Sequence, residues 1–291
     1  MALFLYILLC LIWGSTWLAI KIGVSQAPPF YAAGLRFVVA VALLSAIALV
    51  RGYRYPRSLT RILALGYPGI FMYGASYALV YLAERDINSG TTAVLFAAFP
   101  FFVAALAWLM YRSERLGWLG WAGMMIGFAG VVLISYDSVQ ISAQVFTSSL
   151  LAIGAPLVSA YGIVIHKHRF ASENIVVAAN IQMIFGGVLL LAAALIFESW
   201  GQIQWTGASV GSILFLAVFG TVVAFLGYYW LVARLPVTTV SLVAFITPLI
   251  AVLIGIAAAE ETFTAATVAG AALTLAGVLL TIWPRAARVR I

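Results

Sequence analysis

The chain has 291 residues, of which 65% are hydrophobic and only 8% are charged, and its formal net charge is +7. So little polar surface cannot cover a water-soluble globule of this size, which excludes a soluble domain and predicts an integral membrane protein. Because a membrane-spanning helix needs about 20 mainly apolar residues, we predict an all-α fold of ten transmembrane helices. Their expected cores are 3–22, 29–50, 62–82, 89–110, 117–135, 147–166, 175–197, 208–232, 237–258 and 264–283.

The basic residues predict how these spans are oriented. If the N-terminus is cytoplasmic, twelve of the fifteen Lys and Arg residues fall in cytoplasmic segments, whereas only Lys21 and Arg85 fall on the other side. This asymmetry predicts that both termini are cytoplasmic, and it explains the net charge without a nucleic-acid partner. The first span lacks a basic n-region and is longer than a signal peptide, so we expect it to be retained.

Span 3–22 carries Trp13 and Trp17, which are four residues apart and therefore share one helix face. Two interpretations stay open, because the pair can pack against another helix or line a substrate cavity. The single cysteine, Cys10, lies in the same span and excludes an intramolecular disulfide or a cysteine-cluster metal site. We expect no metal and no cofactor.

Arg36 is the one basic residue inside a predicted span, 29–50. An arginine at this depth costs a few kcal/mol on insertion scales, so it faces the interior of the bundle or extends to the membrane surface. Its role is either structural, by capping backbone carbonyls, or functional, by attracting a substrate carboxylate.

Three tyrosines of span 62–82, Tyr73, Tyr77 and Tyr81, follow each other at intervals of four, with Ser76 beside them. A buried tyrosine hydroxyl needs a hydrogen-bond partner, and a hydrated cavity supplies one. This favours a cavity-lining role. Tyr228 and Tyr229 of span 208–232 lie near its predicted cytoplasmic end, where we expect them to anchor the helix.

Pro100 and Pro248 interrupt spans 89–110 and 237–258 at matching places. A proline inside a helix removes one backbone hydrogen bond, so equivalent kinks could act as gates. Proline is also common in membrane helices, so static packing is the favoured interpretation for either residue alone, and the matched pair leaves the two interpretations even.

The segment HKHR at 166–169 follows a predicted span and contains both histidines of the chain. His166 titrates near neutral pH when exposed and is the one candidate for proton coupling, but a solvated basic turn is the favoured interpretation. Span 117–135 contains glycines at positions 117, 120, 123, 127 and 130, which indicate close helix packing within a monomer.

The chain contains a divergent internal repeat. AGVVL at 129–133 recurs as AGVLL at 276–280, and Glu114 recurs as Glu261, both at an offset of 147 residues. We expect two repeats, 1–140 and 145–285, in one compact membrane domain. Since each repeat has five spans, an odd number, the second is inverted relative to the first, as in many secondary transporters.

These features resemble the EamA-type branch of the drug/metabolite transporter (DMT) superfamily. The resemblance rests on LIWGSTW at 11–17, on Leu35-Arg36-Phe37, on the paired prolines with the acidic residues that follow them, and on the repeat endings. Within this branch, the chain looks most similar to the YddG-type amino-acid exporters. The resemblance implies an inner-membrane permease that exports amino acids, particularly aromatic and other bulky ones, or related metabolites by alternating access.

Three other functions fit the residues less well. A carrier for phosphorylated metabolites such as nucleotide sugars needs several buried Lys or Arg residues, whereas only Arg36 is placed inside a span. An integral membrane enzyme needs a catalytic cluster, and a channel needs a continuous polar stripe. We therefore expect a transporter, not an enzyme, whose partners are a small-molecule substrate and the lipid bilayer. Trp13, Trp17, Arg36, Tyr73, Ser76, Tyr77 and Tyr81 are the predicted substrate-binding residues.

Overall fold

The computed structural model describes residues 2–112, 117–241, 243–259 and 264–286, and the regular elements in these ranges are all helical. In the first half of the chain, a π-helical segment, η1, joins α3 to α4 without a break. The elements of this half are α1 (Ala2–Gln26), α2 (Pro29–Val50), α3 (Leu59–Gly69), η1 (Ile70–Ala75), α4 (Ser76–Ala83), α5 (Ser89–Phe96), α6 (Phe99–Tyr111) and α7 (Trp118–Ile141).

The second half has the same order of elements, with a second π-helical segment, η3, between α10 and α11. A short 3₁₀ helix, η2, lies between α9 and α10. The elements are α8 (Ala143–Phe170), α9 (Ile175–Phe197), η2 (Trp200–Gln202), α10 (Gly207–Ala217), η3 (Val218–Val223), α11 (Ala224–Arg234), α12 (Val237–Ser241), α13 (Val243–Ala259) and α14 (Ala265–Ala286).

All ten predicted span positions coincide with helices. Within the described residues, eight helices or helical runs are long and apolar enough to cross a membrane. The two other predicted spans, 117–135 and 264–283, coincide with α7 and α14. Helix starts follow ordinary capping chemistry: the Asn174 side chain accepts hydrogen bonds from two backbone N–H groups of α9, and Pro29 occupies the first position of α2.

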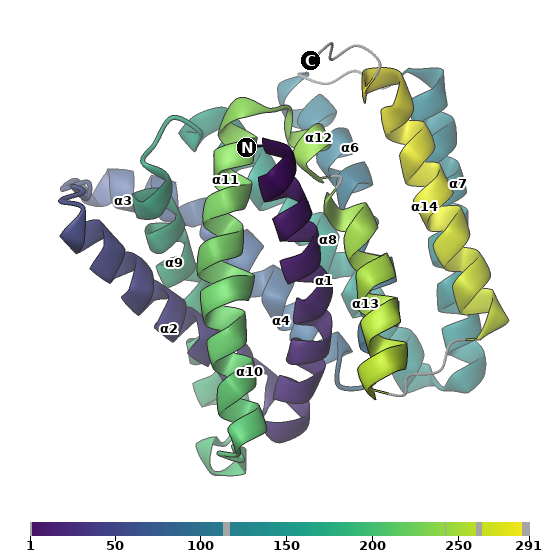
Figure 1. Cartoon of the computed structure of the whole chain (residues 1–291), viewed down its shortest axis with the longest axis horizontal. Helices are drawn as coiled ribbons and strands as arrows, with labels where there is room; N and C mark the ends of the chain where they lie inside the picture. Colours follow the sequence, from purple (N-terminus) through teal and green to yellow (C-terminus); the bar gives the residue numbers. More distant parts are fainter. Residues whose placement is uncertain (1, 113–116, 242, 260–263, 287–291) are drawn as a thin grey trace.

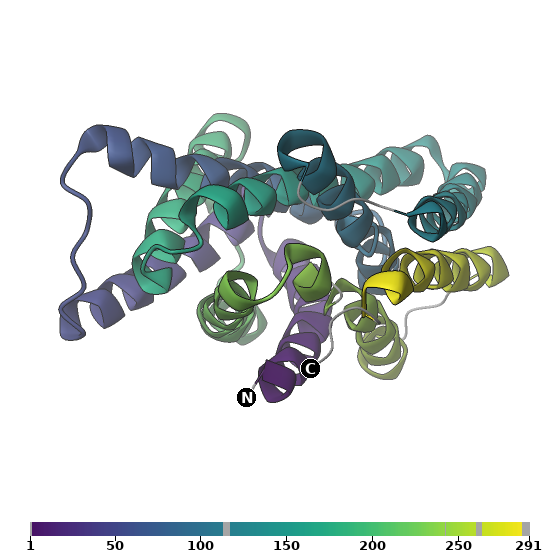
Figure 2. The ribbon, with the colours of Figure 1, turned by 90° about the horizontal axis from the view of Figure 1, so that it is seen from above.

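The helices of the two halves interleave, so that each half has helices that pack against several helices of the other. The first helix of the chain, α1, contacts α10, α11 and α13, and α8 in turn contacts α3, α4 and α6. Figure 2 shows the purple α1 lying next to the green helices of the second half. A space at the centre of the bundle is therefore bounded by helices of both halves.

The helices α7 and α14 lie side by side at one edge of the bundle (Figure 1). Glycines allow this close approach: a methyl group added at Gly130 would lie 2.4 Å from the carbonyl oxygen of Gly270, and one at Gly277 would lie 2.4 Å from that of Gly123. Gly123 and Gly130 of span 117–135 therefore serve helix packing within the chain, as expected, whereas a methyl group at Gly117 would meet no atom within 4 Å. In the same view, α1 begins and α14 ends at the same end of the bundle.

Candidate functional site

A cavity of about 100 Å³ lies between the two halves at the centre of the bundle, with room for several water molecules. The described part of its wall is mostly apolar and aromatic, with a few hydroxyl groups and one charged side chain. The lining residues are Trp13, Thr16, Trp17, Ile20, Arg36, Met72, Ser76, Tyr77, Val80, Phe96 and Phe99 from the first half, and Ser159, Ile163, Phe225, Tyr228, Val240, Ser241, Val243, Ala244 and Thr247 from the second.

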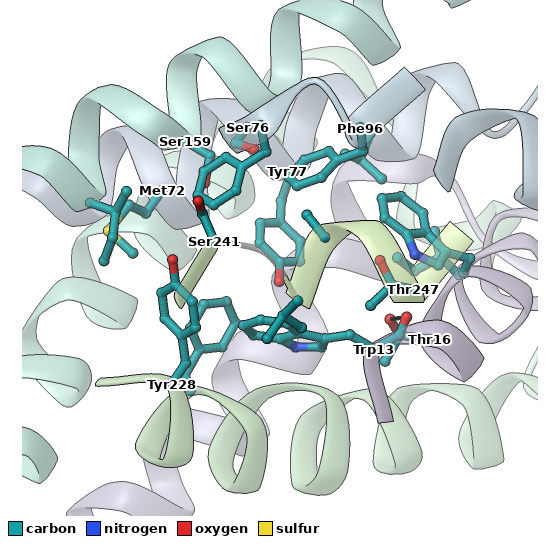
Figure 3. A pocket seen from close by; sticks show the side chains of 18 of the residues that line it. Trp13, Thr16, Met72, Ser76, Tyr77, Phe96, Ser159, Tyr228, Ser241 and Thr247 are labelled. Carbon is teal, nitrogen blue, oxygen red and sulfur yellow. Dashed lines mark hydrogen bonds between the residues drawn. The ribbon is translucent and has the colours of Figure 1, made fainter. Parts of the chain in front are cut away.

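Trp13 and Trp17 of α1 both line this cavity. The Trp13 indole Nε1–H donates to the carbonyl oxygen of Gly220 at 3.2 Å, and its ring packs on Tyr228 with 5.1 Å between centroids. Trp17 packs on Phe96 at 5.4 Å, and its buried Nε1 has no hydrogen-bond partner among the described protein atoms. Figure 3 shows Trp13 and Tyr228 on one side of the cavity and Tyr77 on the opposite side.

Arg36 is the charged residue of the cavity wall, and it is only 1% exposed. Its Nε and Nη2 donate to the hydroxyl of Thr221 at 3.0 and 2.8 Å, and Nη1 donates to the hydroxyl of Tyr81 at 3.3 Å. The guanidinium also lies 4.8 Å from the ring centre of Tyr77. Among the described residues its contacts are therefore hydroxyls and aromatic rings, neither a capped carbonyl nor a carboxylate. Its burial excludes the interpretation that it extends to the membrane surface.

The three predicted tyrosines form a ladder of neighbouring rings, because Tyr73 and Tyr77 lie 6.4 Å apart and Tyr77 and Tyr81 lie 6.3 Å apart. The prediction that these tyrosines share one helix face is therefore confirmed. Only Tyr77, with Ser76 beside it, lines the cavity, whereas Tyr73 and Tyr81 lie outside its wall. Tyr81 holds Arg36 from one end of the ladder, and Tyr73 donates to the hydroxyl of Tyr229 at 2.9 Å at the other end.

His166 belongs to a second buried polar cluster, which also contains Gln182, Tyr229 and Tyr73. Its Nδ1 lies 3.0 Å from Nε2 of Gln182, its ring stacks on Tyr229 at 4.1 Å, and the Tyr229 hydroxyl donates to Gln182. The expectation of a solvated basic turn at 166–169 is therefore wrong for His166, which is 3% exposed. It does not line the cavity, and a coupling role stays a prediction.

The expectation that Tyr228 and Tyr229 anchor a helix end is also wrong, since they are 3% and 1% exposed. The internal repeat contains a signal for this burial: Tyr229 is 148 residues after Tyr81, the partner of Arg36. Position near a span end favoured anchoring, but packing of α11 against α1 and α9 buries both rings.

A polar recess of about 550 Å³ opens where α1 ends and α2 begins, beside the end of α9. There the Glu198 carboxylate accepts hydrogen bonds from the backbone N–H groups of Phe30 and Tyr31 at 2.8 and 2.9 Å. Glu198 follows α9 directly, and partial burial raises the pKa of its carboxyl group. This contact fixes the start of α2, the helix that carries Arg36.

Comparison with known proteins now identifies the family. A model of the EamA-like transporter family matches residues 1–136 and again residues 146–283. The chain belongs to the EamA-like transporter family. It is therefore a membrane transporter of the drug/metabolite transporter superfamily, as the sequence motifs predicted.

Several members of the EamA-like family are similar over most of the chain. The inner membrane transporter YedA of Escherichia coli (strain K12) is 31% identical over 258 residues, which cover 87% of this chain and 81% of YedA. The transporter YoaV of Bacillus subtilis (strain 168) is 25% identical and covers 93% of this chain and 92% of YoaV. Both are named uncharacterized transporters. Helices and family together make this chain a multi-pass inner membrane protein.

One protein of known crystal structure superposes on this EamA-family chain with a TM-score of 0.72 at 19% identity, over 97% of this chain and 98% of the other. At this level of identity, the match shows a common fold and no more.

The two prolines of this EamA-family chain differ in setting, contrary to the expectation of equivalent kinks. Pro100 is the second residue of α6, and α5 already ends at Phe96, so the helix is interrupted before the proline. Pro248 lies inside α13, where it deprives the carbonyl of Ala244, a cavity-lining residue, of its helical partner. Of these two prolines, only Pro248 is placed to affect the cavity from within a continuous helix.

Proposed function

We propose that this EamA-family transporter is a secondary exporter of amino acids, chiefly aromatic and other bulky or apolar ones, or of related small metabolites. It acts by alternating access around the central cavity. The observation that carries this proposal is the composition of the wall: aromatic and aliphatic side chains surround a space that contains one buried cation, Arg36. Such a wall suits a small molecule with an apolar body and one anionic end.

The proposal includes ten spans in two inverted repeats with cytoplasmic termini. Matching contacts support it. The chain has two lysines, and Lys21 donates to the carbonyl oxygens of residues 84 and 87, while Lys167 donates to those of residues 232 and 235. The two lysines are 146 residues apart, and the carbonyl groups that accept from them are 148 residues apart in each pair. The π-helical segments also begin 148 residues apart, at Ile70 and Val218. The twofold match of the family model fits the same division.

The position of the cavity fits this symmetry as well. Trp13 and Ser159, which are 146 residues apart, both line it, and so do Phe96 and Ala244, which are 148 apart. Equivalent positions of both repeats in one wall support a cavity on the axis that would relate the repeats. That is where transporters with inverted repeats hold their substrates.

Phosphorylated metabolites such as nucleotide sugars fit less well. They carry two or more negative charges, and Arg36 is the one charged residue among the described residues of the wall. The second charge would be buried without a partner, which is costly.

Counterflow in proteoliposomes tests the proposal. Vesicles loaded with unlabelled phenylalanine, methionine or threonine are diluted into trace labelled amino acid, with and without a pH gradient, and protein-free vesicles serve as the control. We expect saturable accumulation of labelled phenylalanine. It should fall strongly in Trp17→Ala and Tyr77→Ala, because these changes remove contact area but leave the spans intact. Absence of exchange with all three amino acids and with other small metabolites would contradict the proposal.

A further inference from the structure

We propose that the cavity selects an aromatic or large apolar 2-oxo acid over the corresponding amino acid. This inference rests on the proposed function, since it names the substrate class of the same cavity. In this assignment, Arg36 binds the carboxylate, the aromatic wall encloses the side chain, and hydrogen-bond donors of the wall meet the oxo oxygen.

Arg36 has hydrogen-bonding capacity that the protein itself does not use. A guanidinium has five N–H groups, and three of them donate to Thr221 and Tyr81. The guanidinium also interacts with the Tyr77 hydroxyl, so at most two N–H groups remain for a ligand, and a planar guanidinium suits a carboxylate. Because Arg36 forms no ion pair among the described residues, a monoanionic ligand would neutralise a buried charge that the protein leaves unpaired.

The other unpaired polar groups of the wall are hydrogen-bond donors. Two residues of the wall, Trp17 and Tyr228, contain a buried polar atom without a hydrogen-bond partner among the described protein atoms, the indole Nε1 and the phenol oxygen. An indole N–H can only donate, and a phenol can donate as well. Figure 3 shows the hydroxyl end of Tyr228 directed from its helix toward the side of the cavity with Met72 and Ser241. These two wall residues therefore contain unpaired donors, which suit a ligand oxygen and not a further donor.

The ammonium group of an amino acid suits this wall less well than an oxo oxygen does. This group consists of donors and needs acceptors, preferably a carboxylate. The wall offers neutral acceptors, its hydroxyl groups and the Ala244 carbonyl, but none of its described residues is acidic, and the ammonium would lie close to the guanidinium that holds the neighbouring carboxylate. Replacing it by an oxo oxygen removes the like-charge repulsion and supplies an acceptor to the unpaired donors. The site is thus better matched to the 2-oxo acid.

Calorimetric titration of the purified full-length protein tests this assignment with four probes that share one phenyl group: phenylpyruvate, 3-phenylpropionate, phenylalanine and phenethylamine. One recovered hydrogen bond corresponds to about tenfold in affinity, so phenylpyruvate should bind about tenfold more tightly than 3-phenylpropionate and than phenylalanine. Phenethylamine, which has no carboxylate, should not bind. Tighter binding of phenylalanine or phenethylamine than of phenylpyruvate would overturn the inference.

Matched variants distinguish the effect of the unpaired hydrogen-bond donors from the effect of ring packing. Trp17→Phe and Tyr228→Phe keep a ring but remove the unpaired donor, so each should reduce the preference for phenylpyruvate over 3-phenylpropionate. Trp13→Phe is the control, because the Trp13 N–H already donates to Gly220; it should change both affinities by the same factor. An unchanged preference in Trp17→Phe and Tyr228→Phe would overturn the role of these donors.

Arg36→Gln should weaken the binding of phenylpyruvate and of 3-phenylpropionate at least about tenfold. If this variant does not fold, the two donor variants still decide the question. Counterflow distinguishes the inference from the proposed function: exchange of phenylalanine without exchange of phenylpyruvate would overturn only the inference, whereas absence of exchange with every probe would overturn both.

Discussion

Arg36 on α2 and Thr221 on η3 are joined by two hydrogen bonds, of 3.0 and 2.8 Å, that connect the two halves of the chain. The same hydroxyl donates to the carbonyl of Leu216, so it also fixes the π-helical turn. Thr221→Val keeps the shape of the side chain but leaves two N–H groups of a buried cation without an acceptor. We expect a loss of stability of about 1–3 kcal/mol.

Thermal unfolding of the detergent-solubilised protein, followed by tryptophan fluorescence, measures this loss. Thr147→Val is the matched control, because the Thr147 hydroxyl is exposed and bonds to its own helix at Ala143. Equal midpoints for the two variants would show that the bond between Arg36 and Thr221 does not stabilise the contact between the halves.

The two lysines provide a second test. Each ammonium group donates to two backbone carbonyls at the end of a helix, Lys21 to Glu84 and Ile87, and Lys167 to Val232 and Leu235. Lys21→Met and Lys167→Met should each lower stability by about 1.5–3 kcal/mol, because charged donors are lost from partly buried acceptors. Arg169→Met, at an exposed position, should have little effect. A large effect of only one lysine variant would contradict their structural equivalence.

The close contact between α7 and α14 predicts that replacing one of its glycines lowers the stability of the protein strongly. In Gly130→Ala the new methyl group would lie 2.4 Å from a backbone oxygen of α14, which forces the helices apart. The expected loss is about 1–3 kcal/mol. Gly211→Ala is the control: its methyl group meets no atom within 4 Å, and alanine favours the helix. The thermal midpoint should fall in the first variant and stay or rise in the second.

Pro248 and Pro100 should differ in their effects on transport. Pro248→Ala restores a hydrogen bond to the Ala244 carbonyl inside α13, worth about 1 kcal/mol, and this corresponds to roughly a fivefold change in exchange rate if the bond breaks during the cycle. Pro100→Ala should change the rate little, because a proline in the first turn of a helix costs no hydrogen bond. Counterflow rates at saturating substrate give the comparison. A larger effect of Pro100→Ala would show that the break before α6 is the moving element.

Much of this architecture follows from the sequence alone. Apolar runs of spanning length determine where the helices lie, because the lipid leaves the backbone no other way to satisfy its hydrogen bonds. The intervals between Trp13 and Trp17 and along the ladder from Tyr73 to Tyr81 determine which side chains share a face, since helix geometry is local. The motifs and the internal repeat are sufficient to indicate the transporter family, because both are properties of the residue order.

Tertiary structure decided what lies opposite each face. The tyrosine ladder is longer than the cavity, so Tyr77 lines it while Tyr81 bonds to Arg36. Thr221, which accepts two hydrogen bonds from Arg36, is 185 residues away in sequence, and His166 is buried by Gln182 and Tyr229, which belong to other helices. Periodicity within one helix carries no information about the helix that packs against it. The burial, the partners and therefore the chemistry of the central cavity depend on how α1 and α2 of one half meet η3 and α11 of the other.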